Sequence, residues 1–148
     1  MNTSFKVLIL FAVVLLGIAA ASSGILAGGS VKVQVVNAKG KPVPGETVLV
    51  FKRGEGLMKC KCQNGICVPA AEAMAVTAAK GARGATGVAE FTNLMPSTDF
   101  VACINFKCTS ANNQPCQNDQ NCGFNAGVCV PFTTDKKGNA PAFKINKP

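Results

Sequence analysis

Eight cysteines constrain this chain more than any other feature of its sequence. All of them follow an apolar N-terminal run, and none belongs to a C-x2-C pair. An even number of cysteines in an exported chain is typical of a disulfide framework, whereas zinc sites and dithiol redox sites usually contain C-x2-C. We therefore prefer disulfides, and a thiolate metal site and redox catalysis are the alternatives for these cysteines. We predict disulfides at Cys60, Cys62, Cys67, Cys103, Cys108, Cys116, Cys122 and Cys129.

The cysteines form one group of three and one group of five, with thirty-five residues between the groups. Because both counts are odd, one or three disulfides must join the groups if a single chain is fully oxidised. Cys60 and Cys62 share one face of a strand, so their Cα atoms would lie about 6.5 Å apart, at the limit for a disulfide. We predict that one of these two residues pairs with Cys103 or Cys108.

The N-terminal segment has the layout of a secretory signal peptide. After Lys6 the residues are apolar or small as far as position 21, and Ala19 and Ala21 form an A-x-A pattern before two serines. This layout is typical of an export signal that is cleaved. The uncharged run from residue 7 to residue 31 is also long enough for a span of about 20 residues, so a retained anchor is the alternative.

These features divide the chain into three parts. We predict a signal peptide or retained anchor at 1–21, a short linker at 22–30, and one domain at 31–148 with Cys-rich insertions at 60–67 and 108–129. A domain of this length can bury one modest hydrophobic core. Export and oxidised cysteines together predict a secreted or cell-surface location.

Alternating apolar residues predict an all-β domain. Residues 31–35 are Val-Lys-Val-Gln-Val, the period-2 pattern of a strand with one buried face. Beyond a Gly- and Pro-containing turn, residues 47–51 are apolar on both faces, which suits a strand inside a sandwich. Residues 87–95, 100–106 and 140–145 give further strands. The predicted core is Val33, Val35, Leu49, Phe51, Ala89, Phe91, Leu94, Phe100, Ala102, Ile104 and Phe106.

Three other segments carry local signals. Asn64-Gly65 is a tight-turn pair, so Cys62 and Cys67 should flank a small hairpin. Residues 109–127 are rich in Asn, Gln and Gly, and we expect a loop that disulfides hold in place. Residues 70–80 include six alanines, which favours a short helix, with a strand at 74–77 as the alternative.

Two motifs resemble known domains. Residues 40–45, Gly-Lys-Pro-Val-Pro-Gly, and residues 86–96, which contain G-x-A-x-F-x-x-L-x-P, occur in this order in carboxypeptidase-regulatory-like and bacterial Ig-like domains. The resemblance covers about a quarter of the chain. It implies an antiparallel β-sandwich of about seven strands, Ig-like or transthyretin-like. The eight cysteines and the loop at 109–127 depart from these families, so we add disulfide-braced loops to the predicted fold, with one short helix at 70–80. The resemblance also implies a non-catalytic surface, stalk or adhesion module.

The residue types argue against catalysis. The chain has no His, which removes the commonest general base near neutral pH. Its seven carboxylates are scattered singly. We therefore predict no enzyme activity, no catalytic residue, no cofactor and no metal. Without Lys6 the chain has fourteen Lys and Arg against seven Asp and Glu, a net charge of +7. No Trp or Tyr is available to stack bases, so we expect no nucleic-acid partner.

Two functional hypotheses remain. The first is a secreted or cell-surface β-sandwich module with a structural or adhesive role. The second is a small disulfide-rich binding protein, such as an inhibitor or ligand-capturing protein, that uses loop 109–129, because function concentrates on loops held by a rigid scaffold. The expected partners are other cell-surface or extracellular macromolecules, and a membrane only if the N-terminal segment is retained.

Overall fold

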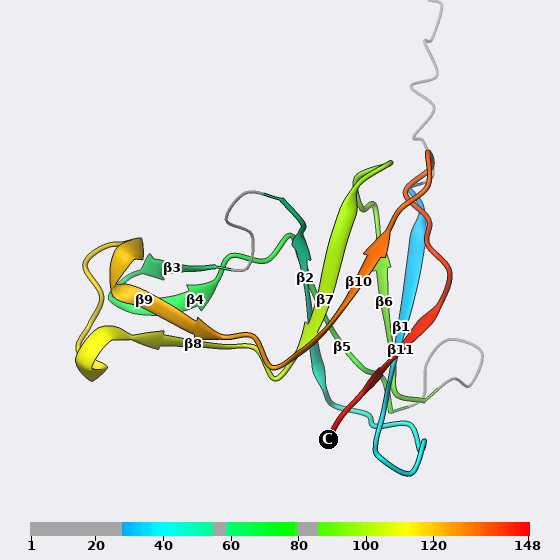
Figure 1. Cartoon of the computed structure of the whole chain (residues 1–148), viewed down its shortest axis with the longest axis horizontal. Helices are drawn as coiled ribbons and strands as arrows, with labels where there is room; N and C mark the ends of the chain where they lie inside the picture. Colours follow the sequence, from blue (N-terminus) through cyan, green and yellow to red (C-terminus); the bar gives the residue numbers. More distant parts are fainter. Residues whose placement is uncertain (1–27, 55–58, 80–85) are drawn as a thin grey trace, which may run out of the picture.

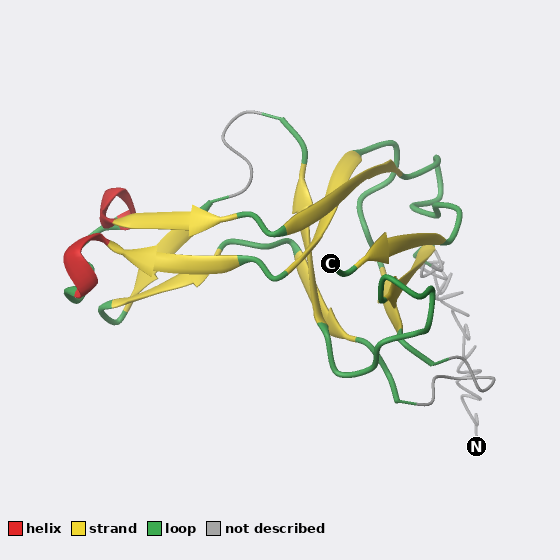
Figure 2. Ribbon diagram, turned by 60° about the horizontal axis from the view of Figure 1, so that its bottom comes forward, coloured by secondary structure: helices red, strands yellow, loops and turns green. Residues whose placement is uncertain are grey.

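A computed structural model of the chain describes residues 28–54, 59–79 and 86–148 (Figure 1). The predicted signal peptide and most of the predicted linker lie outside the described residues. The described part has two regions: a pair of sheets that share a core, and an arm of two hairpins that extends from one end of the larger sheet (Figures 1 and 2).

Seven strands form the two sheets that share the core. The smaller sheet has the order β11-β1-β6, and the larger has the order β10-β7-β2-β5. Every pair is antiparallel except β1 with β11, which is parallel. The all-β prediction is confirmed, whereas the assignment to an Ig-like or transthyretin-like type stays a prediction. The strands are β1 (Ser30–Val36), β2 (Thr47–Lys52), β5 (Ala73–Val76), β6 (Val88–Thr92), β7 (Asp99–Ile104), β10 (Val128–Thr133) and β11 (Phe143–Asn146).

The first core lies between the two sheets. In β1 the valines at 31, 33 and 35 are buried and Lys32 is exposed, as the alternation predicts. They pack with Phe91, Phe100 and Ile145 from three other strands. Burying this apolar surface from both sheets stabilises the fold at about 25 cal/mol per Å² removed from water.

A second core covers the other face of the larger sheet. It explains why β2 is apolar on both sides: Val48 and Val50 face the first core, and Leu49 and Phe51 face the second. Cys103 of β7, together with Cys60 and other residues from the base of the arm, completes this second core. All eleven residues predicted for the core are buried, but Leu49, Phe51 and Phe106 belong to the second core rather than the first.

Phe106 changes face because the strand bends before it. The alternation predicts that Phe106 continues the buried face of Phe100 and Ile104, but β7 ends at Ile104 and Asn105 has a φ of 57°. Opposite this bend lies Gly127, where a Cβ atom would come within 2.1 Å of the carbonyl oxygen of Ile104. A glycine is therefore required there, and the bend redirects both strands into the arm.

Two of our secondary-structure predictions are wrong. Residues 70–80 contain β5 instead of a helix, because β2 offers backbone partners and Ala73 and Ala75 pack on the first core. A helix this short has little stability of its own, so tertiary pairing outweighs the alanine preference. Residues 109–127 are not one loop, since β8 (Lys107–Ser110) and β9 (Cys122–Asn125) pair there.

Candidate functional site

The disulfide arm, residues 59–70 and 107–126, consists of two hairpins that lie side by side (Figures 1 and 2). The first contains β3 (Cys60–Gln63) and β4 (Ile66–Pro69), and its turn has positive φ at Asn64 and Gly65, as predicted. The second contains β8 and β9, with the short 3-10 helices η2 (Ala111–Asn113) and η3 (Asp119–Asn121) at its tip.

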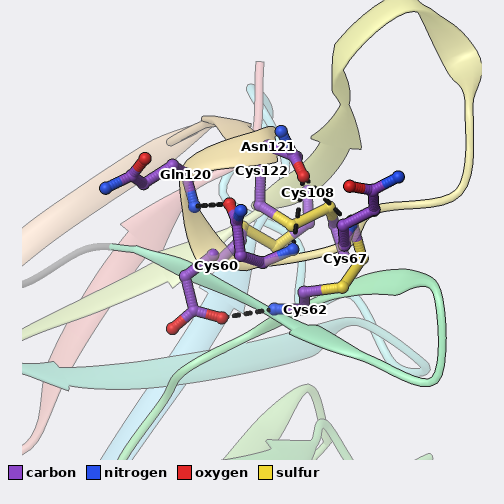
Figure 3. Close-up of a disulfide and its surroundings, with 11 residues drawn as sticks. Cys60, Cys62, Cys67, Cys108, Gln120, Asn121 and Cys122 are labelled. Carbon is purple, nitrogen blue, oxygen red and sulfur yellow. Dashed lines mark hydrogen bonds between the residues drawn. A yellow bond between two sulfur atoms is a disulfide. The ribbon is translucent and has the colours of Figure 1, made fainter.

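All eight cysteines form disulfides. Three bridges join the first hairpin to the segment 108–122, and the fourth joins β7 to β10 (Figure 3 shows the arm). The prediction that either Cys60 or Cys62 pairs with Cys103 or Cys108 is confirmed, since Cys60 pairs with Cys108, and the number of bridges between the groups is three. The Cα atoms are 5.9, 5.8, 5.6 and 4.1 Å apart in Cys60–Cys108, Cys62–Cys116, Cys67–Cys122 and Cys103–Cys129.

The bridges supply stability that the hairpins lack. An isolated two-stranded hairpin is marginal in water. The three arm bridges close sequence separations of 48, 54 and 55 residues. In the chain-entropy model a single bridge of this span is worth on the order of 4 kcal/mol. The three loops overlap, so their contributions are not additive, but together they hold two segments that are distant in sequence as one unit.

Hydrogen bonds fix the tip of the arm against the first hairpin. The Cys62 amide donates to Asp119 Oδ1 at 2.7 Å, and the Cys116 amide donates to the Gly65 carbonyl at 3.0 Å. Asn118 and Asn121 form a capping box at the start of η3 (Figure 3). The Asn- and Gln-rich segment between β8 and β9 is therefore folded by local side-chain bonds and not only by its bridges.

Three aromatic rings connect the arm to the larger sheet. The ring centroids of Phe51 and Phe106 are 4.6 Å apart, and those of Phe106 and Phe124 are 5.3 Å apart. Phe124 lies on β9 and is 45% exposed. Our sequence analysis did not single out Phe124, because one aromatic residue in a polar segment carries no periodicity.

The surface of the arm is polar and weakly basic. It has ten Asn or Gln residues, three Lys and one Asp. Ile66, at the turn of the first hairpin, is 65% exposed. Beside it lies an open hollow of about 320 Å³, lined by Gly65, Ile66, Ser110, Asn113, Gln114 and Pro115 among others. The amide side chains and the exposed side chain of Ile66 can bind a partner through hydrogen bonds and a small apolar contact.

The sulfur atoms of Cys67, Cys116 and Cys122 come within 4.8 Å of one another. Metal binding needs thiolates, and each of these sulfur atoms is already in a disulfide. The cluster is therefore a consequence of two neighbouring bridges.

Most carboxylates among the described residues have structural partners. Glu90 pairs with Lys32 at 3.3 Å, and Glu46 pairs with Lys147. Asp135 Oδ1 accepts hydrogen bonds from the Asn139 and Lys137 amides at 2.9 and 2.7 Å. These backbone donors, that of Asn139 first, hold the pKa of the Asp135 carboxyl below its ordinary value.

Comparison with protein-family models and with curated proteins finds no match for this chain. Across residues 28–54, 59–79 and 86–148, no helix has the length and apolar character needed to cross a membrane. Four disulfides indicate an extracellular or otherwise oxidising environment.

Proposed function

We propose that this protein is a secreted or cell-surface β-sandwich module with a structural or adhesive role, and that the disulfide arm is its contact surface. The observation that carries the proposal is the construction of the arm. Three disulfides hold a polar, amide-rich double hairpin beyond the end of the larger sheet (Figure 2). A rigid arm loses little conformational entropy when it binds, which favours contact with a macromolecular surface.

The residue chemistry of the arm supports a non-catalytic role. The arm presents amides, Lys side chains and Ile66, and the single carboxylate in it, Asp119, is bonded to the Cys62 amide. No histidine exists anywhere in the chain. The partner is accordingly another extracellular or cell-surface macromolecule, and no cofactor is required.

An adhesion assay tests this proposal. Beads coated with the oxidised protein are incubated with cells of the producing organism, and retained beads are counted. We expect retention for the wild type and a loss of more than half of it for Ile66→Glu, which adds a charge beside the hollow. Met95→Glu is the matched control, because Met95 is exposed on the loop after β6, away from the arm. Equal retention by both variants would contradict the role of the arm.

A second candidate is a soluble binding protein that captures a smaller ligand in the hollow beside Ile66. The concave lining by Ser110, Asn113 and Gln114 favours this candidate. Fractionation of the producing culture separates the two. Protein that is retained on the cell surface or in an assembly supports the structural or adhesive role, and free monomer in the medium supports the binding protein.

A further inference from the structure

We infer that the hollow near the tip of the disulfide arm is a binding site for a neutral glycan, such as an uncharged sugar chain of a cell surface. The hollow has a volume of about 320 Å³ and lies between the turn of the first hairpin and the segment of β8 and η2 (Figure 2). This inference rests on the proposed role of the arm as a contact surface, and it names the chemical class of the partner.

The walls of the hollow are held in place although they come from two distant segments. Two of its lining residues, Cys67 and Cys108, are in disulfides that join the hairpins. The Cys116 amide donates to the Gly65 carbonyl at 3.0 Å, and the Pro115 Cβ lies 3.4 Å from the position that a Cβ on Gly65 would occupy. A site whose walls are fixed before binding loses little conformational entropy when a ligand enters it.

The polar side chains that line the hollow are available to a ligand. Among the described residues, no hydrogen bond involves the Ser110 hydroxyl or the side-chain amides of Asn113 and Gln114. Other amides at the tip are used by the fold, since Asn118 and Asn121 form the capping box of η3. The amides that line the hollow are therefore not needed to hold the tip together.

The chemistry of the lining fits uncharged hydroxyl groups. A hydroxyl or a carboxamide both donates and accepts hydrogen bonds, whereas Lys only donates and a carboxylate only accepts. Sugar hydroxyls have the same double capacity, so neighbouring hydroxyls of one ring can pair with Asn113 and Gln114. Ile66, which is 65% exposed, and Pro115 offer aliphatic surface to the C–H groups of the ring.

Other ligand classes fit the hollow less well. No charged side chain is among the described residues that line it, so a charged ligand would find no opposite charge there. The centre of a protein interface is usually more apolar than Ile66 and Pro115 alone can make it. The volume lies near the lower end of the range for ligand pockets, roughly 300–1,000 Å³, which suits the end or a short stretch of a glycan.

An NMR titration of the isotope-labelled, oxidised protein with oligosaccharides tests the inference. The neutral probes are cellotetraose, mannotetraose and N-acetylchitotetraose, and tetragalacturonate is the acidic comparison. We expect at least one neutral probe at millimolar concentration to shift the side-chain amide signals of Asn113 and Gln114. Its dissociation constant should not depend on salt, because no charge pair forms.

Asn113→Gly and Asn112→Gly are a matched pair of variants. The two residues are neighbours with φ values of 54° and 56°, and glycine keeps this left-handed conformation at either position. Asn113 lines the hollow, and Asn112 is not among its described lining residues. We expect the dissociation constant to rise about tenfold for Asn113→Gly, which loses the hydrogen bonds of one side chain, and to stay unchanged for Asn112→Gly. Both variants should keep the wild-type signals of β3 and β8.

Three results would overturn the inference: no response to any neutral probe, a response to tetragalacturonate alone, or equal affinity of the two variants. If coated beads still adhere to cells in any of these cases, the proposed function stands and the arm contacts another component. If a neutral probe binds but the beads do not adhere, the glycan site stands and the adhesive role is wrong.

Discussion

Cys103 and Cys129 lie directly opposite each other on β7 and β10, with their Cα atoms 4.1 Å apart and their sulfur atoms joined. This bridge is part of the second core, in contact with the group that includes Leu49, Phe51 and Phe106. It stands just before the bend at Asn105 where the two strands leave the sheet. The other three bridges lie beyond that bend, so the four disulfides serve two different regions.

This division predicts two different effects of bridge removal. Replacing both Cys103 and Cys129 with Ala should lower the global stability by about 3–4 kcal/mol, from the chain-entropy value for its separation of 26 residues. The effect is global because the bridge is built into the core of the larger sheet. Chemical denaturation followed by circular dichroism measures it. A variant as stable as the wild type would show that the second core does not need this bridge.

Replacing both Cys62 and Cys116 with Ala should act locally. The bridge ties the first hairpin to the tip of the arm, and neither Cys62 nor Cys116 belongs to the first core. We expect faster amide exchange throughout β3, β4, β8 and β9 and a melting temperature close to that of the wild type. Hydrogen exchange with mass spectrometry measures the arm and the sheets in one experiment. An equal increase of the exchange rate in β1 and β6 would contradict a local effect.

Phe91→Ala tests the first core. Phe91 is buried on β6, opposite Val31 of β1, and packs between the two sheets. Loss of a buried Phe side chain should cost about 3–5 kcal/mol. Phe124→Ala is the matched control, because that ring is half exposed on the arm and should cost much less. If both variants melt at the wild-type temperature, the face assigned to Phe91 is wrong.

The turn at Asp135 predicts a dependence of stability on acid. Its lowered pKa means that the folded state favours the charged carboxylate, so its contribution is present above the ordinary value of 3.8 and is lost as the pH falls below it. Asp135→Asn keeps an acceptor oxygen but removes the titration. We expect the melting temperature of this variant to fall less than that of the wild type on acidification. An equal fall in both proteins would show that Asp135 is not the cause of the acid dependence.

Removal of the N-terminal segment remains a prediction from sequence. The A-x-A pattern at Ala19 and Ala21 predicts a mature protein that begins near Ser22. Mass spectrometry of the intact secreted protein checks the cleavage position. Membrane-bound protein that still contains Lys6 would mean that the segment is an anchor.

The sequence predicted those parts of the fold that local pattern determines. The alternation around Val33 and Phe100 identified two central strands, and the Asn64-Gly65 pair identified the first hairpin. The odd numbers of cysteines in the two groups predicted that disulfides must join them. The strand β5 forms because the edge of β2 offers backbone partners to it. The sequence of residues 70–80 alone carries no information about that edge.

The arm was harder to predict for the same reason. The strands β8 and β9 are continuations of β7 and β10 beyond a bend, and the bend arises from Asn105 facing Gly127 across the pair. Neither residue signals a continued strand by itself. The ring contact of Phe124 with Phe106 could not be predicted either, because it exists only when the bend places Phe106 on the outer face of the larger sheet.

A non-reducing tryptic map tests the central claim, that two distant hairpins are joined into one arm. Within the first hairpin Cys62 lies directly opposite Cys67, so a local bridge between them is the obvious competitor. Trypsin should release residues 62–80, 84–107 and 108–136 as separate peptides once the protein is reduced. We predict that without reductant these three remain one linked species. Release of peptide 62–80 with its own internal disulfide would contradict the arm.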